Sequence, residues 1–384
     1  MDHYNLPLYR SWFPFLSTGT VWLNHAATSP LSTRVNDALA RYLAGRTMGP
    51  IDMFVPTLPT VVRTKENLAK LISADPKRIG FVMNTSDGLN ILAEGLTWKS
   101  GDRVLLNDQE FPSNVVPFLN LRHFGVEIDF IKTINGAVTP EDVEHMLTPR
   151  TRLLSISFVQ FLSGYKADLH AIGELCKRRG VIFSVDAIQG LGAAPLDAQA
   201  MQIDFLSCGG TKWLMGTLGL GFIFLTEALQ QQIQQAFIGW TSNKDFFSNF
   251  FQYRIDPDPS ARRFENGTQN YLGITALHAS TSTLLEVGIE NIREHLFSLT
   301  DMLLAIADEE GLKLFTPRDR DHRAGIVTFT VPSADKVFAH LQEAHVIVSL
   351  REGLLRVAPH FYSNADDIER FGQALRAALR SVRP

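Results

Sequence analysis

Short apolar runs alternate with amphipathic stretches of helical period between residues 60 and 225, and this alternation constrains the fold more than any other feature. Strand followed by helix, repeated over this length, favours a doubly wound, mostly parallel sheet with helices on both faces. We therefore predict an α/β fold for this large region. The apolar runs predict strands at Ile79–Met83, Arg103–Leu106, Val126–Ile131, Leu153–Phe158, Val181–Val185, Phe205–Ser207 and Gly221–Leu225.

The pattern changes beyond Pro257, where the sequence predicts a small C-terminal α+β domain. A chain of 384 residues with 45% hydrophobic content is long enough for two domains. We predict a large domain at residues 17–260 and a small domain at residues 261–384. The elements predicted for the small domain are a helical region from about Leu272 to Gly311, strands at Gly325–Val331, Val346–Leu350 and Leu354–Ala358, and helices at Ala334–Glu343 and from Asn364.

Charge and composition limit the partners of the chain. The net charge of −4 and the isoelectric point near 6.3 give no general positive field for nucleic acid or anionic lipid. There is no basic-then-apolar leader and no apolar run of about eighteen residues. We expect a cytoplasmic protein without nucleic-acid or membrane partners, in which Cys176 and Cys208 are buried free thiols. No HExxH motif or P-loop occurs, so the sequence predicts no metal site.

Asp186 and Lys212 form the strongest chemical pattern, in the segments SVDAIQG at 184–190 and DFLSCGGTKW at 204–213. Asp186 ends a continuous apolar run, which places it at the carboxyl end of a parallel strand, where open α/β sheets bind ligands. Lysine can form an imine with an aldehyde cofactor, and aspartate can keep the ring nitrogen of that cofactor protonated. Alone, the aspartate would more often cap a helix and the lysine would more often be a solvated charge. Together they favour a pyridoxal phosphate (PLP) site.

The segment 84–88, Asn-Thr-Ser-Asp-Gly, is a candidate phosphate site between a predicted strand and a helical run. Amides at a helix N-terminus, with the hydroxyls of Thr85 and Ser86 beside them, suit a phosphate dianion. Taken in isolation, the same segment is more typical of an ordinary N-cap, because serine and threonine are common at caps. The occurrence of the Asp186 and Lys212 pattern in the same chain favours the phosphate interpretation.

These motifs together resemble class V of the fold-type I PLP enzymes. The resemblance rests on D-A-x-Q, a small-residue run ending in T-K, and a glycine-rich stretch with an apolar strand at 216–225; it extends from about Leu23 to Arg370. The group includes cysteine desulfurases, selenocysteine lyases, kynureninases, isopenicillin N epimerase and several aminotransferases. The resemblance implies the fold of a fold-type I PLP-dependent transferase, with PLP held as an internal aldimine on Lys212. It also implies that residues 1–16 pack on the small domain.

Further site residues follow from the resemblance. Asp186 would pair with the ring nitrogen, and Arg356, in a run similar to R-x-G-x-x-R, would bind the substrate α-carboxylate with its planar fork. Asn24 and His25 would form the entry to the substrate site. The remaining cofactor contacts that the resemblance implies are Phe111 on the ring, Gln189 at the phenolic oxygen, and Thr85, Ser86 and Thr211 at the phosphate.

The run at 265–270 resembles the family pattern E-x-G-T-x-N, whose threonine reaches the phosphate in the neighbouring subunit. In this chain that threonine is Thr268. A solvated turn before the following helix is the structural alternative for the same run. The resemblance therefore implies a homodimer whose active sites contain residues of both chains.

The reaction is predicted as transamination of a small amino acid or amine, with Lys212 moving the α-proton. Relatives that are desulfurases carry a persulfide-forming cysteine before the carboxylate-binding arginine, whereas this chain has Glu-Gly-Leu-Leu between Arg351 and Arg356. A family S-N pair is also replaced by Val-Gln-Phe at 159–161. Lyase, epimerase or cysteine desulfurase-like activity remains an alternative on the same scaffold. A catalytically idle PLP-binding homologue is the alternative outside enzymes.

Overall fold

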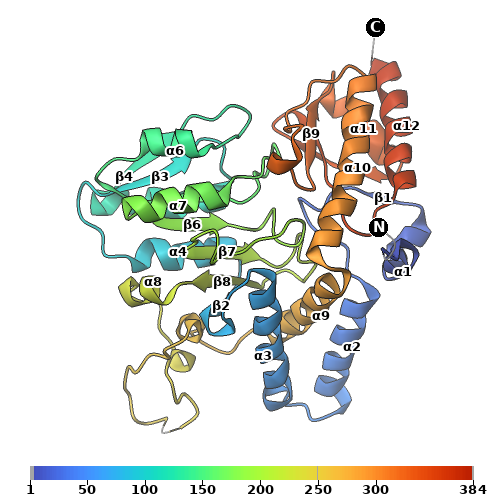
Figure 1. Ribbon diagram of the computed structural model, residues 1–384. Helices are drawn as coiled ribbons and strands as arrows, with labels where there is room; N and C mark the ends of the chain where they lie inside the picture. Colours follow the sequence, from blue (N-terminus) through green and yellow to red (C-terminus); the bar gives the residue numbers. More distant parts are fainter. Residues whose placement is uncertain (1–3, 249, 383–384) are drawn as a thin grey trace.

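The computed structural model describes residues 4–248 and 250–382 and is built around one large sheet (Figure 1). The strands of this sheet are β2 (Ile79–Val82), β3 (Arg103–Asn107), β4 (Glu127–Ile131), β5 (Thr151–Ser157), β6 (Ile182–Asp186), β7 (Phe205–Gly209) and β8 (Gly221–Leu225). Their order is β2-β8-β7-β6-β5-β3-β4. Strand β8 runs antiparallel to β2 and β7, and the other neighbouring pairs are parallel. The predicted mostly parallel sheet is therefore confirmed.

Helices cover both faces of this sheet (Figure 1). They are α4 (Thr85–Gly95), α5 (Val116–Asn120), α6 (Pro140–Met146), α7 (Leu169–Arg179) and α8 (Glu227–Gln232). Successive strand residues point to opposite faces, so Leu153 joins the core cluster of α4, α5 and α8, while Leu154 joins that of α6 and α7. This two-sided burial explains why the strands are apolar throughout.

The ends of α6 and α7 follow signals in the sequence. The Thr139 hydroxyl accepts from the amide of Asp142, whose carboxylate accepts from the amide of Thr139, so α6 begins with a capping box. Asp168 caps α7 by accepting from the amide of Ala171. Helix α7 ends at Gly180, whose φ of 67° is accessible to glycine without a Cβ clash.

Three helices form a separate layer beside the sheet: α2 (Thr33–Met48), α3 (Phe54–Leu71) and α9 (Tyr271–Val287). Helix α9 packs against both α2 and α3. The helical region predicted from Leu272 to Gly311 is two helices, because the chain turns at Gly288, with φ of 86°, before α10 (Ile289–Glu309). Within the described ranges, no helix has both the length and the apolar character needed to cross a membrane.

The C-terminal part forms a three-stranded antiparallel sheet of order β11-β12-β9, covered by two helices. Its elements are β9 (Val327–Thr330), β10 (Val346–Ile347), β11 (Ser349–Arg351), β12 (Leu354–Val357), α11 (Ala334–Glu343) and α12 (Ala365–Val382). Strand β10 instead pairs in parallel with β1 (Val21–Trp22). The strand predicted at Val346–Leu350 is thus divided at Val348, because its two halves have different partners.

The N-terminal segment, with α1 (Leu6–Ser11), packs on the start of α12 and on the chain just before it. The Tyr4 hydroxyl donates a 2.7 Å hydrogen bond to the carbonyl of Phe361, and Arg10 forms a 2.6 Å ion pair with Asp367. Residues 1–3 of the predicted 1–16 segment lie outside the described residues.

The division at residues 17–260 and 261–384 remains a proposal, and residues 249, 383 and 384 lie outside the described residues. Leu277 of α9 shares a core cluster with the large sheet, whereas Val21 shares one with α12. Helix α9 therefore packs with the large sheet, and β1 packs with the C-terminal helix.

Candidate active site

Asp186 and Lys212 come together at one edge of the large sheet. Asp186 is the last residue of β6, and Lys212 follows the end of β7, its parallel neighbour. Parallel neighbours end at the same edge, and that edge is where open α/β sheets bind ligands. The strand positions that the sequence predicts for both residues are therefore observed.

The Asp186 carboxylate is buried, and only one of its two oxygen atoms accepts a hydrogen bond from the described residues. Its Oδ1 accepts a 3.0 Å hydrogen bond from the amide of Ile188, whereas its Oδ2 has no partner among the described residues. Burial raises the pKa of Asp186 to about 7, the charge of Glu110 acts in the same direction, and Lys212 opposes both. An unpartnered buried acceptor is costly by itself, so Oδ2 is suited to an incoming N–H donor.

The amine of Lys212 has a lowered pKa and lies beside an aromatic ring. Burial lowers the pKa of Lys212 to about 8, although the charge of Asp186 acts to raise it. Its Nζ lies 5.5 Å from the centroid of the Phe111 ring, which is 40% exposed. The Phe161 ring meets Phe111 edge-on at 5.2 Å. An open aromatic face next to the lysine can support a flat cofactor ring.

The amide of Gln189 connects the lysine segment to the N-terminal part of the chain. Its Nε2 donates a 2.9 Å hydrogen bond to the carbonyl of Ala26, and its Oε1 accepts one of 2.9 Å from the indole of Trp213. Trp213 directly follows Lys212, so Gln189 helps to fix the backbone that carries the lysine. The second Nε2 hydrogen leaves Gln189 able to donate to a ligand.

The candidate phosphate residues lie at the start of α4, next to the end of β7. Thr85 is buried, and its hydroxyl accepts a 3.0 Å hydrogen bond from the amide of Gly209. A Cβ on Gly88 would lie 2.3 Å from the Ser207 hydroxyl, so glycine lets α4 approach β7 closely. Ser86 and Phe111 line one cavity of about 410 Å³.

Thr211 lies at the contact between the lysine segment and residues 28–29. Its carbonyl accepts a 3.1 Å hydrogen bond from the amide of Ser29, and its hydroxyl lies 3.4 Å from that of Thr28. These contacts hold Thr211 in place beside Lys212. Among the described residues, the Thr211 hydroxyl makes only the long contact to Thr28, so it can also form a hydrogen bond to a ligand.

Arg356 lies on β12 and reaches from the small sheet to the large one. Its Nη1 donates a 2.6 Å hydrogen bond to the carbonyl of Phe161, and its Nη2 donates one of 3.3 Å to the Ser349 hydroxyl, which in turn bonds Asn24. The Nε atom has no partner among the described residues. Burial lowers the pKa of Arg356 to about 10, and the charge of Arg351 adds to this.

His25 lies in the core rather than beside open space. Its side chain is fully buried, and its Nε2 lies 2.8 Å from the Tyr362 hydroxyl. The His360 ring meets it edge-on at 4.6 Å, and Trp213 packs on it as well. The substrate role of His25 stays a prediction, and its neighbour Asn24 is connected to Arg356 through Ser349.

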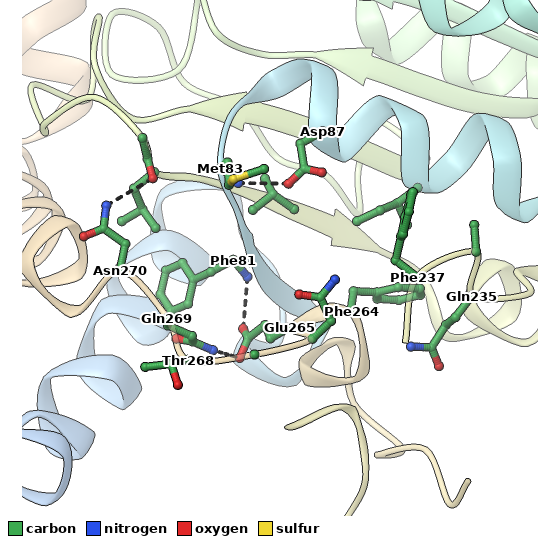
Figure 2. Close-up of a pocket in the computed structure, with 17 residues that line it drawn as sticks. Phe81, Met83, Asp87, Gln235, Phe237, Phe264, Glu265, Thr268, Gln269 and Asn270 are labelled. Carbon is green, nitrogen blue, oxygen red and sulfur yellow. Dashed lines mark hydrogen bonds between the residues drawn. The ribbon is translucent and has the colours of Figure 1, made fainter. Parts of the chain in front are cut away.

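Thr268 lies at a different cavity, of about 240 Å³, shown in Figure 2. Glu265 also lines this cavity. It accepts a 3.0 Å hydrogen bond from the amide of Phe81 and forms a 2.6 Å ion pair with Lys65. Among the described residues, the lining includes Thr268 but neither Lys212 nor Arg356. Within one chain, therefore, Thr268 is not assembled with the other candidate site residues.

Sequence reasoning missed one buried acid, Glu110, which directly precedes Phe111. Its carboxylate accepts hydrogen bonds from Asn107, Ser157 and Gln160. Two residues of the segment 159–161, which replaces the family S-N pair, contact this part of the site. Gln160 donates a hydrogen bond to Glu110, and Phe161 packs on Phe111. The E-x-x-x-N spacing at 110–114 marks the position of Glu110 in the sequence, but it does not indicate the hydrogen bonds that Glu110 accepts.

Comparison with protein families gives one match that spans most of the chain, to the model described as aminotransferase class-V, over residues 21–371. The chain belongs to the aminotransferase class-V family. The resemblance inferred from the motifs is thereby confirmed. Family membership also supports pyridoxal phosphate as the cofactor predicted from the sequence.

Class-V relatives named for different activities match over nearly their full length. An uncharacterized aminotransferase, YcbU, of Bacillus subtilis is 28% identical, with 94% of each chain covered. A probable cysteine desulfurase of Methanothermobacter thermautotrophicus is 27% identical, with 92% of this chain and 94% of the relative covered. An isopenicillin N epimerase of Streptomyces clavuligerus is 26% identical, with 94% of this chain and 96% of the relative covered.

Solved structures share the class-V fold. A C-DES mutant with glycine covalently linked to its PLP cofactor matches with a TM-score of 0.88 and 23% identity, covering 95% of this chain and 98% of that one. A cysteine desulfurase from Thermococcus onnurineus matches with a TM-score of 0.87 and 23% identity, covering 97% of each. These matches confirm the predicted fold-type I architecture.

Proposed function

We propose that this protein is a PLP-dependent enzyme that acts on the amino group of a small amino acid, and that its reaction is transamination. The observation that carries the proposal is the placement of Lys212 and Asp186 at adjacent strand ends, with the Oδ2 of Asp186 buried and without a partner among the described residues. An amine with a pKa near 8 and a buried acceptor without a donor both suit an aromatic aldehyde cofactor with a basic ring nitrogen.

The residues present fit this cofactor. Lys212 would hold its aldehyde carbon, Asp186 its ring nitrogen, Gln189 its phenolic oxygen, and Phe111 one face of its ring. The start of α4, with Thr85 and Ser86, would hold the phosphate beside Thr211. When bound, PLP supplies an electron-withdrawing ring that stabilises negative charge at the substrate α-carbon.

Arg356 and Lys212 would act on the substrate itself. The Nε–H of Arg356 and its remaining Nη protons can bind an α-carboxylate, because its present acceptors are a carbonyl and a hydroxyl, which leave its charge uncompensated. The lowered pKa of Lys212 lets its Nζ carry the α-proton near neutral pH. Burial of both groups strengthens these contacts, because less water competes for them.

The cysteines favour transamination over sulfur transfer by a protein persulfide. Cys176 and Cys208 are both buried. Burial raises the pKa of Cys176 to about 12 and that of Cys208 well above its ordinary value, which disfavours the reactive thiolate. Neither residue lies on the β11–β12 hairpin that carries Arg356.

A lyase or epimerase is the second candidate, favoured by relatives that include probable cysteine desulfurases and an isopenicillin N epimerase. Removal of the α-proton would be common to all of these reactions, so the same residues would serve them. The products separate them: transamination gives a 2-oxo acid and the amine form of the cofactor, elimination gives a leaving group, and epimerisation gives the mirror-image amino acid.

A homodimer in which Thr268 reaches the neighbouring site is part of the proposal. Thr268 lies apart from Lys212 within one chain, so a role at the phosphate needs a second chain. Exposed apolar side chains lie on and beside α2 and α3, including Met48, which is 88% exposed, and Val55, which is 67% exposed. Exposed apolar side chains that gather into a patch are typical of subunit contacts, so this region is the proposed contact.

The test is a single-turnover screen of the PLP-loaded protein against a panel of amino acids. We expect one of them to convert the cofactor to its amine form, with an equal amount of 2-oxo acid and no release of sulfide. Sulfide or another leaving group without the amine form would contradict transamination. Failure of every amino acid, with no exchange of the α-proton in deuterated water, would favour an idle PLP-binding homologue.

A further inference from the structure

Glu110 is a buried acid whose carboxylate is surrounded by donors. Oε1 accepts from the amide of Ser157 at 2.7 Å, from Asn107 Nδ2 at 2.6 Å and from Gln160 Nε2 at 2.9 Å, and Oε2 accepts from the Ser157 hydroxyl at 2.5 Å. The side chain is 8% exposed. Four neutral donors, two of them from Ser157, therefore surround this carboxylate.

Ser157 connects this charge to Asp186. The two residues are partners on the parallel strands β5 and β6, as are Ser155 and Ser184 two positions earlier. The hydroxyls of Ser155 and Ser184 are hydrogen-bonded at 3.1 Å, which shows that these positions share one face of the sheet. Ser157 and Asp186 therefore also share that face, and a single serine separates the Glu110 carboxylate from the Asp186 side chain.

The Asp186 carboxylate lies between two opposing influences. Burial and the charge of Glu110 disfavour its charged form, whereas the charge of Lys212 favours it. Asp186 in turn acts on the buried Cys208 thiol, whose pKa it helps to raise. An incoming cation at the unpartnered Oδ2 would interact favourably with both carboxylates. The same pair would disfavour a neutral ligand at that point, because one buried negative charge would then stay uncompensated.

We propose that Glu110 is a positioning residue. Its negative charge, separated from Asp186 by Ser157, keeps the ring nitrogen of the bound cofactor protonated. This inference rests on the proposed function, since it concerns the same PLP site. A protonated ring nitrogen draws electrons from the substrate more strongly than a neutral one. Asp186 touches that nitrogen, and Glu110 acts through Asp186.

The experiment uses PLP labelled with ¹⁵N in the ring and measures its NMR shift in the holoenzyme as a function of pH. We expect the wild type to keep the ring nitrogen protonated to higher pH than Glu110→Gln, with a midpoint lower by about one pH unit or more in the variant. Glu174→Gln, which removes an exposed carboxylate on α7, is the matched control and should leave the midpoint unchanged.

A charge swap separates electrostatics from packing. In Glu110→Gln combined with Gln160→Glu, the charge moves across the 2.9 Å contact between the two side chains. The midpoint should return towards the wild-type value in the swap, and this variant also carries the test if Glu110→Gln alone does not fold. A swap whose midpoint stays low although its charge is present would show that Glu110 acts only through its hydrogen bonds.

The outcomes distinguish this inference from the proposed function. Wild-type protein that binds labelled PLP, together with a Glu110→Gln variant of unchanged midpoint, overturns the role of Glu110 and leaves the PLP site intact. Wild-type protein that shows no bound cofactor signal overturns both.

Discussion

Arg356 of β12 donates a 2.6 Å hydrogen bond from Nη1 to the carbonyl oxygen of Phe161, and this contact joins the small sheet to the loop after β5. The ring of Phe161 in turn packs on Phe111, which lies beside Lys212. Arg356 is therefore connected to the lysine by three successive contacts. A substrate bound through its carboxylate would be placed by the same contacts that shape the aromatic wall.

Replacing Arg356 with alanine should weaken the binding of α-amino acids while leaving the attachment of PLP to Lys212 intact. The substrate carboxylate would lose a charge-assisted partner in a partly dry site, at a cost of about 2–5 kcal/mol. The measurement is the KM of wild type and variant for the true substrate, with the cofactor absorbance as the check on attachment. Arg356→Lys, which keeps the charge but not the planar fork, should fall between them. Equal KM values for wild type and Arg356→Ala would remove Arg356 from the substrate site.

Much of the fold follows from local sequence patterns. The large-sheet strands end within about two residues of their predicted limits, because buried parallel strands are continuous apolar runs between helices with clear caps. The break at Gly288 was missed, since both flanking helices keep an apolar period and a single glycine is tolerated within a helix. The division at Val348 was missed because it depends on β1, which is far away in sequence.

The candidate site was predictable only where a motif coincides with a strand end. Asp186 and Lys212 satisfy that condition. The enclosure of His25 could not be predicted in this way, because it depends on Tyr362 and His360, which the fold brings to it from the other end of the chain. Glu110 could not be assigned a role from sequence alone, since its donors come from different loops and strands.

The two cysteines should be dispensable for catalysis. Cys176→Ala combined with Cys208→Ala should leave turnover within a small factor of wild type, because neither thiol lies on the hairpin that carries Arg356. Steady-state kinetics with the substrate found in the amino-acid screen make the comparison. If cysteine-dependent sulfide release existed and vanished in this variant together with a protein persulfide, the rejection of the desulfurase route would be wrong.

The buried amine of Lys212 should make the stability of the cofactor-free protein depend on pH. Its pKa is lowered from 10.5 to about 8, so between these values the unfolded chain binds more protons than the folded one, and stability rises with pH. The penalty for the buried charge is complete below about pH 8. Lys212→Met should therefore be more stable than wild type at pH 7, by a margin that shrinks by on the order of 1–3 kcal/mol towards pH 10. Urea unfolding of both proteins measures the margin, and a constant margin would argue against a buried amine.

Subunit mixing tests whether Thr268 serves the neighbouring chain. Thr268→Ala and Lys212→Ala should each be impaired alone. In a mixed dimer, one site then carries both changes and the other carries neither, so activity should rise above that of either parent after subunit exchange. Mixtures that exchange subunits without any gain would show that Thr268 serves its own chain, or that it has no role at the site.

Covalent trapping of the cofactor tests the central claim most directly. The protein is incubated with PLP, reduced with sodium borohydride, digested and mapped by mass spectrometry, with Lys212→Ala treated in parallel. We predict a yellow protein whose reduced adduct lies on Lys212 alone, and no adduct at any lysine of the variant. A protein that gains no absorbance band with PLP, or an adduct on another lysine that persists in Lys212→Ala, would contradict the assignment.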